Sequence, residues 1–545
     1  MANFVIAIGG TGMRCLESFV HLCAVGLFDN NEINILTLDT DQTNGNKGRV
    51  ESLVNKYNKV KTNDQQTIGG QPCSDSFFSA KLNLYKFFAD YSTSERQTLN
   101  SLSKISSSGE DNQDLADLFF ERESVQSFDL SHGYRAQTHL GSMLMYHAII
   151  EAALRYKASP NEAKEHERDL CDFLDKLGEN SNNAKVFVFG SVFGGTGASS
   201  IPVLPVAISE ALKILKGGKT QLDLNQVKFG STLLTNYFTF NSPSDEQLQK
   251  DKVIADANNF ALNSQAAMGF YNDDPTVKTT YKVLYHIGWP ADVRINYSES
   301  SGGRVLTGGT EQENPCHIAE LMCASAAYDF FNVQELDNKE ANYVFRTVEE
   351  TDGSGLNFTG ASFVGDDIAE SFENKIGALL SLSHIILGTY EGSYAEVNGV
   401  ELLLSDLSKE RDIFDYDTLN QVQAKEINDY LQEYAYKIVE GKFKPGWIYQ
   451  VFQSVGKGMF LFKSNAFESN IGSLNRVDYA NIFTDPNHNW SLKRKMGGIT
   501  TEDKYDAFVR VLRQNETLPE EKQGSSIKEK FLAHLYNTMT ILQNY

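Results

Sequence analysis

Two segments far apart in this chain share one layout, and this repetition restricts the fold more than any other feature. In the first, a β-branched run at 4–8 stops at Gly9-Gly10-Thr11-Gly12, and residues with helical spacing follow over 13–26. In the second, the apolar run 185–189 leads through Gly194-Gly195-Thr196-Gly197 to an apolar helix at 201–215. A strand, a glycine turn and a helix in this order are typical of a parallel α/β sheet.

Other segments extend this pattern. The strand predicted at 33–38 ends at Asp39-Thr40-Asp41, and further strands are predicted at 227–234 and 281–287. Loops that follow parallel strands share one edge of the sheet, so we expect a ligand crevice there. The remaining helices of this half are expected at about 138–156, 160–178 and 245–269. The region 42–130 is more polar, and its stretch 92–114, rich in Ser, Asn and Asp, is expected to be a surface excursion or mobile loop.

The second half of the chain begins with an apolar helix. Asn314-Pro315 favours a helix start, and the residues up to 331 are apolar on nearly all sides, which predicts a helix buried between layers. Beyond a polar linker at 333–365 the pattern predicts helices at 366–389, 504–514 and 526–541 and strands at 398–404 and 457–463. We therefore expect three parts: a nucleotide-binding domain over 1–312, a linking helix over 313–332, and a second α+β domain with C-terminal helices over 333–545.

Composition excludes several classes of function. The chain has 545 residues and a formal charge of −22, which argues against binding nucleic acid or anionic lipid. Six scattered cysteines form no metal-binding pattern and indicate a reducing compartment. No segment reaches the roughly 20 apolar residues that cross a bilayer. The first residues lack the basic start and the longer apolar stretch of a signal peptide, so none is expected. We expect a cytoplasmic protein without membrane insertion.

Glycine turns between strands and helices expose backbone N–H groups that bind phosphate. One such turn is a weak signal, but two on one sheet edge can converge on a single polyphosphate. The P-loop pattern is absent from the chain. The dinucleotide fingerprint fails at its third small residue, where Cys15 stands, although Asp39 lies where a ribose ligand belongs. A Rossmann-type enzyme therefore stays open as an alternative.

The order of these motifs resembles the tubulin/FtsZ superfamily, in particular its divergent bacterial tubulin-like members. The first glycine turn, the segment ending at Asp41, and His132-Gly133-Tyr134-Arg135 resemble successive loops of that family. Gly194–Gly197 resembles its glycine-rich signature, and Tyr237-Phe238-Thr239-Phe240 resembles the Pro-Phe-Thr-Phe segment of FtsZ. The resemblance covers residues 1–331 and implies a parallel-sheet nucleotide domain, a central helix and a second domain.

The sequence departs from the family in three ways. Phe193, Ala198 and Ser199 replace residues of the glycine signature, and the region 42–130 and the C-terminal third make the chain longer than FtsZ. The Asn-x-Asp-x-x-Asp loop that completes hydrolysis has no clear counterpart. Asp366 and Asp367 are the acids we select for that role, with capping of a helix as their other interpretation. Glu335 and Asp337 are the other acids in this region, and we interpret them as solvated charges of the linker.

The resemblance implies GTP or GDP as the ligand, with Mg²⁺ as a possible companion. Backbone groups of the two turns would hold the phosphates, Asp39 or Asp41 would reach the ribose or the metal, and Arg135 would face the γ-phosphate or form a surface ion pair. Asn314, Asn258, Asn259 and Asn263 are base candidates by position. The predicted nucleotide-binding set is Gly9, Gly10, Thr11, Gly12, Met13, Asp39, Asp41, Gly133, Gly194, Gly195, Thr196, Gly197, Ala198, Ser199 and Asn314.

Three functions follow from these patterns. The first is a tubulin-like GTPase that self-assembles, in which the next subunit supplies the acids for hydrolysis, as the resemblance implies. The second is a nucleotide-binding scaffold or switch with little hydrolysis, read by unidentified protein partners. The third is a dinucleotide enzyme. Assembly of so acidic a chain should be favoured by salt or Mg²⁺.

Overall fold

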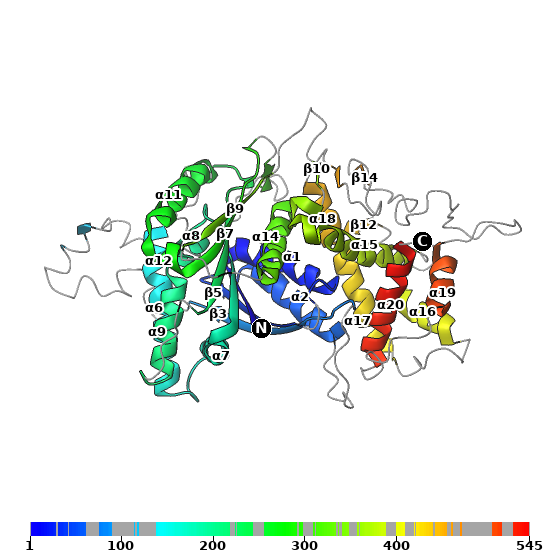
Figure 1. Ribbon diagram of the computed structural model, residues 1–545, viewed down its shortest axis with the longest axis horizontal. Coiled ribbons are helices and arrows are strands. Elements are labelled where there is room, and N and C mark those ends of the chain that lie inside the picture. The colour runs from blue at the N-terminus through cyan, green and yellow to red at the C-terminus, as the bar shows by residue number, and fades with distance from the viewer. Residues whose placement is uncertain are drawn as a thin grey trace, which may run out of the picture.

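The computed structural model of the chain centres on one seven-stranded parallel sheet with strand order β3-β2-β1-β4-β5-β7-β9 (Figure 1). The structure describes residues 2–28, 31–41, 43–61, 76–89, 114, 117–118, 138–218, 224, 226–242, 256–291, 294–297, 309–310, 312–333, 336, 340–347, 357–358, 360–388, 399–408, 419, 421–439, 442–454, 459–460, 469–470, 504–514 and 527–543. The strands of the sheet are β1 (Ala2–Ile8), β2 (Glu32–Asp39), β3 (Lys81–Phe88), β4 (Ala184–Phe189), β5 (Lys228–Leu234), β7 (Tyr281–Ile287) and β9 (Asn342–Arg346). This confirms the predicted parallel α/β fold.

Alternating side chains of the strands supply two separate cores, one on each face of the sheet. Along β1, Phe4 and Ile6 enter one core while Val5 and Ala7 enter the other. The first core packs against α6 (Thr138–Ala158), α7 (Glu165–Glu179), α9 (Leu204–Leu215) and α12 (Pro275–Thr280). The second packs against α1 (Gly9–Ala24), α2 (Gly45–Lys61) and α14 (Ile318–Asn332).

The C-terminal helices continue the second core instead of building a separate one. They lie beyond α1 and α2, on the right of Figure 1. Trp447 donates to Ser18 Oγ at 3.0 Å, Lys375 donates to Gly26 O at 2.6 Å, and Lys528 donates to Lys59 O at 2.6 Å. These helices are α15 (Asp366–Gly388), α16 (Gly399–Ser408), α17 (Gln421–Tyr434), α18 (Trp447–Ser454), α19 (Lys504–Gln514) and α20 (Ile527–Gln543).

Short elements complete the described part. Small ladders join β6 (Phe238–Thr239) with β8 (Ile295–Asn296), β11 (Tyr436–Val439) with β12 (Lys442–Pro445), and β10 (Asn357–Phe358) with β13 (Met459–Phe460) and β14 (Ser469–Asn470). The remaining helices are α8 (Gly195–Ser200), α11 (Phe260–Asp273) and the 3₁₀ turns Ser181–Asn183, Ala257–Asn259 and Gly360–Ser362. Edge strand β9 lies beyond residue 332, so the main sheet draws on the C-terminal half as well.

The strand predicted at 398–404 is wrong. The segment 398–404 is part of helix α16, because Val400, Leu403 and Leu407 recur at helical spacing and pack together into the core. The region 42–130 contributes helix α2 and edge strand β3, which were not predicted because both mix polar residues with apolar ones. The surface loop predicted at 92–114 lies, apart from Asp114, outside the described residues.

The buried helix α14 begins at Ile318, four residues later than predicted. His317 is its N-cap: the ring accepts a hydrogen bond from Ala319 N at 3.1 Å, and the backbone N–H of His317 donates to Glu320 at 2.9 Å. This reciprocal pairing is a capping box. Asn314 therefore lies ahead of the helix.

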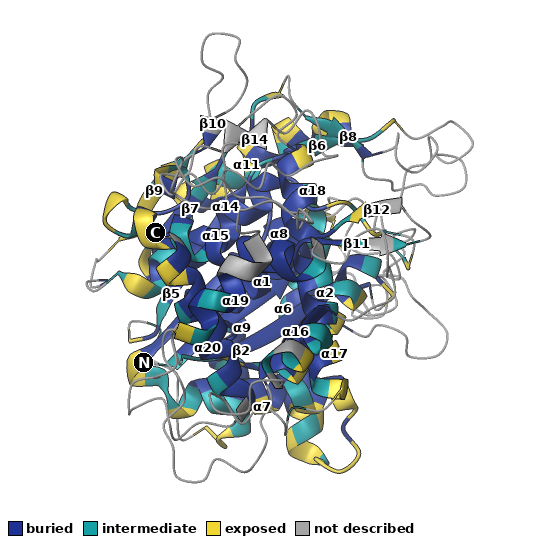
Figure 2. Cartoon of the chain, turned by 90° about the vertical axis from the view of Figure 1, so that its right-hand side faces the viewer, coloured by how far each residue is buried: buried dark blue, intermediate teal, exposed yellow. Residues whose placement is uncertain are grey.

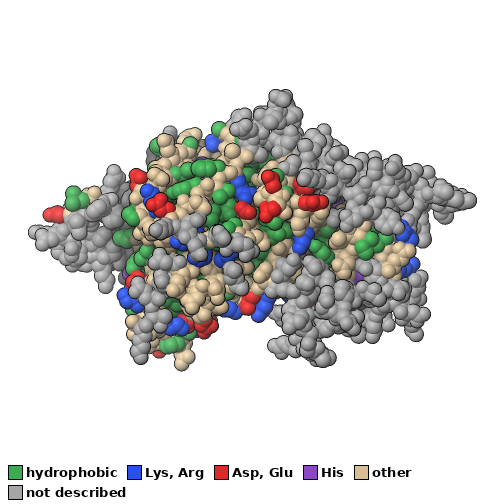
Figure 3. All heavy atoms as spheres, viewed as in Figure 1, with side chains coloured by type: hydrophobic (Ala, Val, Ile, Leu, Met, Phe, Trp, Pro, Cys, Tyr) green, Lys and Arg blue, Asp and Glu red, His purple; other side chains and the backbone are tan. Residues whose placement is uncertain are grey.

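Burial is highest around the sheet and the helices that cover it, as the dark blue elements of Figure 2 show. On the surface in Figure 3, acidic and basic side chains are interspersed over the described part of the face shown.

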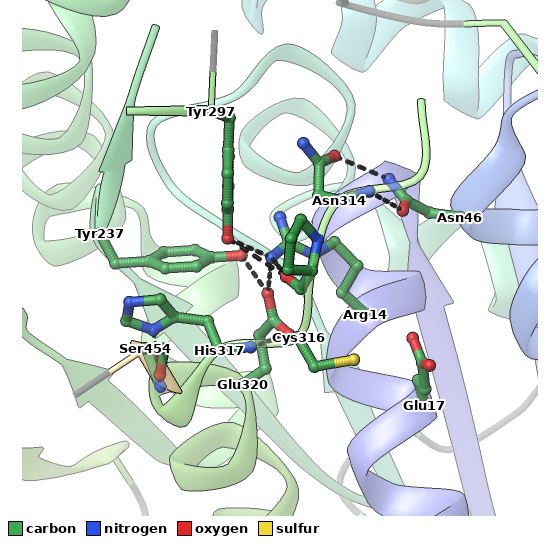
Figure 4. A network of polar contacts seen from close by, with 12 residues as sticks. Arg14, Glu17, Asn46, Tyr237, Tyr297, Asn314, Cys316, His317, Glu320 and Ser454 are labelled. Carbon is green, nitrogen blue, oxygen red and sulfur yellow. Dashed lines mark hydrogen bonds and ion pairs between the residues drawn. The ribbon is translucent and has the colours of Figure 1, made fainter. Parts of the chain in front are cut away.

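A buried ion pair joins α1 to α14. Arg14, two residues after the first glycine turn, pairs with Glu320, and the two side chains are 2% and 0% exposed (Figure 4). Arg14 also donates to Tyr297 Oη at 2.6 Å and to Pro315 O at 2.8 Å, while Tyr237 donates to Glu320 at 2.6 Å. Burial raises the pKa of Glu320, and both Arg14 and the Tyr237 hydroxyl oppose that rise. We call Arg14, Glu320, Tyr237 and Tyr297 the buried clamp.

The clamp yields a stability prediction. Glu320→Gln should lower the free energy of unfolding by about 3–5 kcal/mol, because it leaves the guanidinium of Arg14 buried without a counter-charge. Arg14→Met combined with Glu320→Gln should lose less than the sum of the two single losses, by about 2 kcal/mol. Urea unfolding measures both. Lys425→Gln, which breaks an exposed pair with Asp429, is the control and should cost less than about 1 kcal/mol. Strict additivity of the two clamp variants would contradict the coupling.

Candidate functional site

The two glycine turns meet at the carboxyl edge of the sheet. Strands β1 and β4 are neighbours and parallel, so the turns that follow them lie side by side. Helix α1 begins at Gly9 and helix α8 at Gly195. A Cβ placed on Gly9 would lie 3.1 Å from Cβ of Thr196, so the turns are in contact. The convergence expected from the sequence is present in the structure.

Packing accounts for some of these glycines. A Cβ on Gly12 would lie 2.5 Å from Phe189 O, and one on Gly197 would lie 2.7 Å from Ser191 O. Gly9 has a φ of +65°, which side chains rarely adopt. These three glycines are required by the fold itself, whether or not a ligand binds.

Packing does not account for Gly10 and Gly194. Neither has a positive φ, and an added Cβ would meet only side-chain ends, Asn44 Nδ2 at 3.3 Å and Ser191 Oγ at 3.2 Å. Both residues are partly exposed among buried neighbours, as are Thr11, Gly195 and Thr196. Their missing side chains therefore leave backbone accessible on both turns at the point where they meet.

The loop after β2 adds an acceptor that no described group fills. Asp39 is 2% exposed; its Oδ1 accepts from Thr40 N at 2.7 Å and from Asp41 N at 3.3 Å. Its Oδ2 is buried without a hydrogen-bond partner, and so is Thr40 Oγ1. Burial raises the pKa of Asp39 to about 7. A buried carboxylate oxygen without a donor fits a cation or a hydroxyl group supplied by a ligand.

Asp41 has a different role. Its carboxylate accepts from Thr43 N and Thr43 Oγ1, both at 2.9 Å, and from Gly309 N at 2.7 Å. Asp41 thus holds its own turn and ties it to the segment before α14. Of the two acids predicted to contact the ribose or the metal, Asp39 is the one with a carboxylate oxygen that has no hydrogen-bond partner among the described residues.

A group of carboxamides beside Gly10 was not predicted from the sequence. Asn44 donates to Gln312 at 2.8 Å, and Asn46 donates to Asn314 at 3.3 Å, which joins the start of α2 to the segment before α14. Asn314, a predicted base contact, is therefore held within this group. Asn44-Gly45-Asn46 was its visible sequence signal, because glycine flanked by asparagines marks a turn.

The second turn is held by its neighbours. Ser199 is fully buried and its hydroxyl donates to Thr196 O at 3.0 Å, so it faces its own helix. Ala198 O accepts from Tyr271, and Ser199 O accepts from Ser142 at 2.7 Å. Met13 is likewise fully buried in the core, so only its backbone is a candidate contact.

Among the other base candidates, Asn263 lies nearest to the second turn, where it donates to Phe193 O at 3.4 Å. Asn258 and Asn259 are exposed, and Asn258 donates to Ser242 at 2.8 Å. Gly133, Arg135, Glu335 and Asp337 lie outside the described residues.

Asp366 and Asp367 lie away from the glycine turns. They are exposed at the start of α15, and Gly365 beside them approaches Asp329 in the last turn of α14. That end of α14 lies at the amino edge of the sheet, since Lys185 at the start of β4 donates to Val333 O at 2.7 Å. The predicted acids and the glycine turns are thus at opposite ends of α14.

In comparisons with known proteins, no family model matches the chain, and no curated protein matches it significantly. None of the helices in the described ranges is long and apolar enough to cross a membrane.

Asp39 gives a prediction about pH. Its folded-state pKa lies above the usual value near 3.8, so its contribution to stability falls as pH rises from about 4 to about 7 and then levels off. Asp39→Asn keeps an oxygen for Thr40 N and removes the charge. Without ligand, the variant should be more stable than the parent by about 1–3 kcal/mol at pH 8, and the gain should shrink toward pH 4. Urea unfolding at several pH values measures this; a gain that does not change with pH would contradict the assignment.

Proposed function

We propose that the two glycine turns bind the phosphates of one nucleotide. The observation that carries the proposal is the accessible backbone at Gly10 and Gly194, on turns that touch. Fold packing requires glycine at 9, 12 and 197 but not at these two positions. Backbone N–H groups at the start of a helix bind anions without a lysine, and neither turn contains one.

We further propose that the nucleotide is GTP and that the chain is a tubulin-like GTPase that self-assembles. Support comes from the order of the motifs and from α14, which runs buried from the carboxyl edge of the sheet to its amino edge. Asp39 is the residue that would hold Mg²⁺, through its unfilled Oδ2. A bound Mg²⁺ would neutralise phosphate charge.

The position of the predicted acids supports hydrolysis between copies. Helix α14 has 15 residues and is about 22 Å long, so acids at one end cannot reach phosphates at the other end within one copy. Asp366 and Asp367 are exposed and therefore available to a neighbouring copy. In this proposal hydrolysis requires two copies to meet end to end.

One observation favours the dinucleotide enzyme as the second candidate. The strand order β3-β2-β1-β4-β5-β7 matches that of Rossmann folds, in which a dinucleotide binds where the order reverses between the first and fourth strands. Cys15 at the third small position is fully buried beside Cys323. The second glycine turn has no role in that mode of binding, which is why we place it second.

Nucleotide binding is tested with a variant chosen to spare the fold. Gly194→Val should weaken GTP binding about tenfold or more, because the new side chain covers the accessible backbone while its Cβ meets only Ser191 Oγ. Isothermal titration calorimetry measures the affinity, and nucleotide released from the denatured parent protein identifies the base. Gly269→Val on α11 is the matched control, since a Cβ there meets nothing within 4 Å.

Equal GTP affinity for Gly194→Val and its parent would refute the phosphate site. Release of NAD or FAD from the purified protein would support the dinucleotide enzyme instead.

Hydrolysis between copies is tested by mixing two variants. Asp366→Ala/Asp367→Ala should keep nucleotide binding and lose turnover about 100-fold, because the water loses its activating acids. Gly194→Val should lose turnover because it does not bind GTP. Equal amounts of the two should recover activity when measured as phosphate release, since each supplies what the other lacks.

A mixture no more active than its parts would contradict hydrolysis between copies. If the parent chain binds GTP but its turnover per chain is negligible at every protein concentration, the scaffold or switch is the better description.

A further inference from the structure

A cavity of 750 Å³ lies between the sheet layer and the C-terminal helices, apart from the glycine turns. Its walls come from α1, α2, the segment before α14, α17, the β11–β12 hairpin and α18. Pockets of about 300–1,000 Å³ are the size that holds small molecules. The nucleotide proposal gives this space no role.

The lining is polar and carries an excess of positive charge. Its apolar members are Leu53, Pro315, Pro445 and Trp447. Burial lowers the pKa of His21 to about 3, so that ring is neutral. The charged members are Arg49, Lys56, Lys437 and Lys444 against Glu17, Glu313 and Glu433. On a chain with a net charge of −22, a cavity with this balance is distinct from its surroundings.

Two of the cations are already neutralised. Arg49 pairs with Glu17 at 2.6 Å and donates to Asn314 O at 2.8 Å, and Lys56 pairs with Glu433 at 2.6 Å. Each of these pairs links elements of the cavity wall. Among the described residues, they leave Lys437 and Lys444 as the unpaired cations of the wall, with Glu313 as its one remaining carboxylate.

These two lysines stand directly opposite each other. Lys437 pairs with Lys444 in the antiparallel β11–β12 ladder, so their side chains leave the same face of the hairpin, and both line the cavity. Within the described ranges no carboxylate forms an ion pair with either lysine. Like charges directly opposite across a ladder are destabilising, and an anion between them removes that cost.

We propose that this cavity binds a small polar molecule with two or more negative charges, held between Lys437 and Lys444. Carboxylate or phosphate oxygens both suit paired ammonium groups. Ser52, Gln432 and Gln453 supply neutral polar groups for the rest of the molecule. Asn314 belongs both to this wall and to the carboxamide group beside Gly10, so the ligand would lie next to the residues that border the first glycine turn.

Citrate is the probe for the test, because it carries three carboxylates and no phosphate. Titration of citrate into the full chain, at constant ionic strength and without divalent metal, should give saturable binding with one site per chain in calorimetry. Lys437→Gln/Lys444→Gln should weaken that binding about tenfold or more. Lys213→Gln/Lys278→Gln changes the net charge equally at lysines outside the cavity and should bind citrate like the parent.

Gly194→Val separates this site from the glycine turns and should leave citrate binding unchanged. Three results would overturn the proposal: no saturable binding by the parent, equal affinity after Lys437→Gln/Lys444→Gln, or loss of citrate binding in Gly194→Val. Thermal melting of each variant checks that it is folded. Because citrate binding requires no nucleotide, its failure would leave the proposed function untouched.

Discussion

The ion pair between Arg14 and Glu320 is the interaction on which the rest of this structure depends. Arg14 lies two residues beyond the first glycine turn, and Glu320 lies in the first turn of α14. Two buried charged side chains are stable only when they pair with each other, so this pair holds the start of α1 against the start of α14. Tyr237, which follows β5, donates to the same carboxylate, and the clamp thereby joins α1, α14 and the loop after β5.

The clamp also determines where the candidate site lies. With α1 held in place, Gly12 packs on Phe189 O and Gly9 on Thr196, which brings the second glycine turn against the first. The segment before α14 lies along the start of α2, where its amides meet Asn44 and Asn46. The same segment forms part of the wall of the charged cavity. Both proposed binding sites thus border residues 312–315.

The sequence was most informative where local pattern and tertiary environment agree. The apolar runs of β1 and β4 and their glycine turns were predictable because buried parallel strands are continuously apolar. Helix α16 was not, because Leu-rich segments of this length suit either a strand or a helix until packing decides. The clamp was not predictable either, because Arg14 and Glu320 are 306 positions apart and no local pattern links them. The separate roles of Asp39 and Asp41 depend on single hydrogen bonds that no spacing encodes.

A crystal structure of the chain grown with a non-hydrolysable GTP analogue would test the central claim most directly. The account predicts phosphate density between Gly10 and Gly194, within hydrogen-bond distance of the backbone N–H groups of both turns, and a cation or hydroxyl at Asp39 Oδ2. Phosphates bound by the first turn alone would contradict it, if the backbone N–H groups of the second turn lie more than about 6 Å, roughly two hydrogen-bond lengths, from the phosphate oxygens.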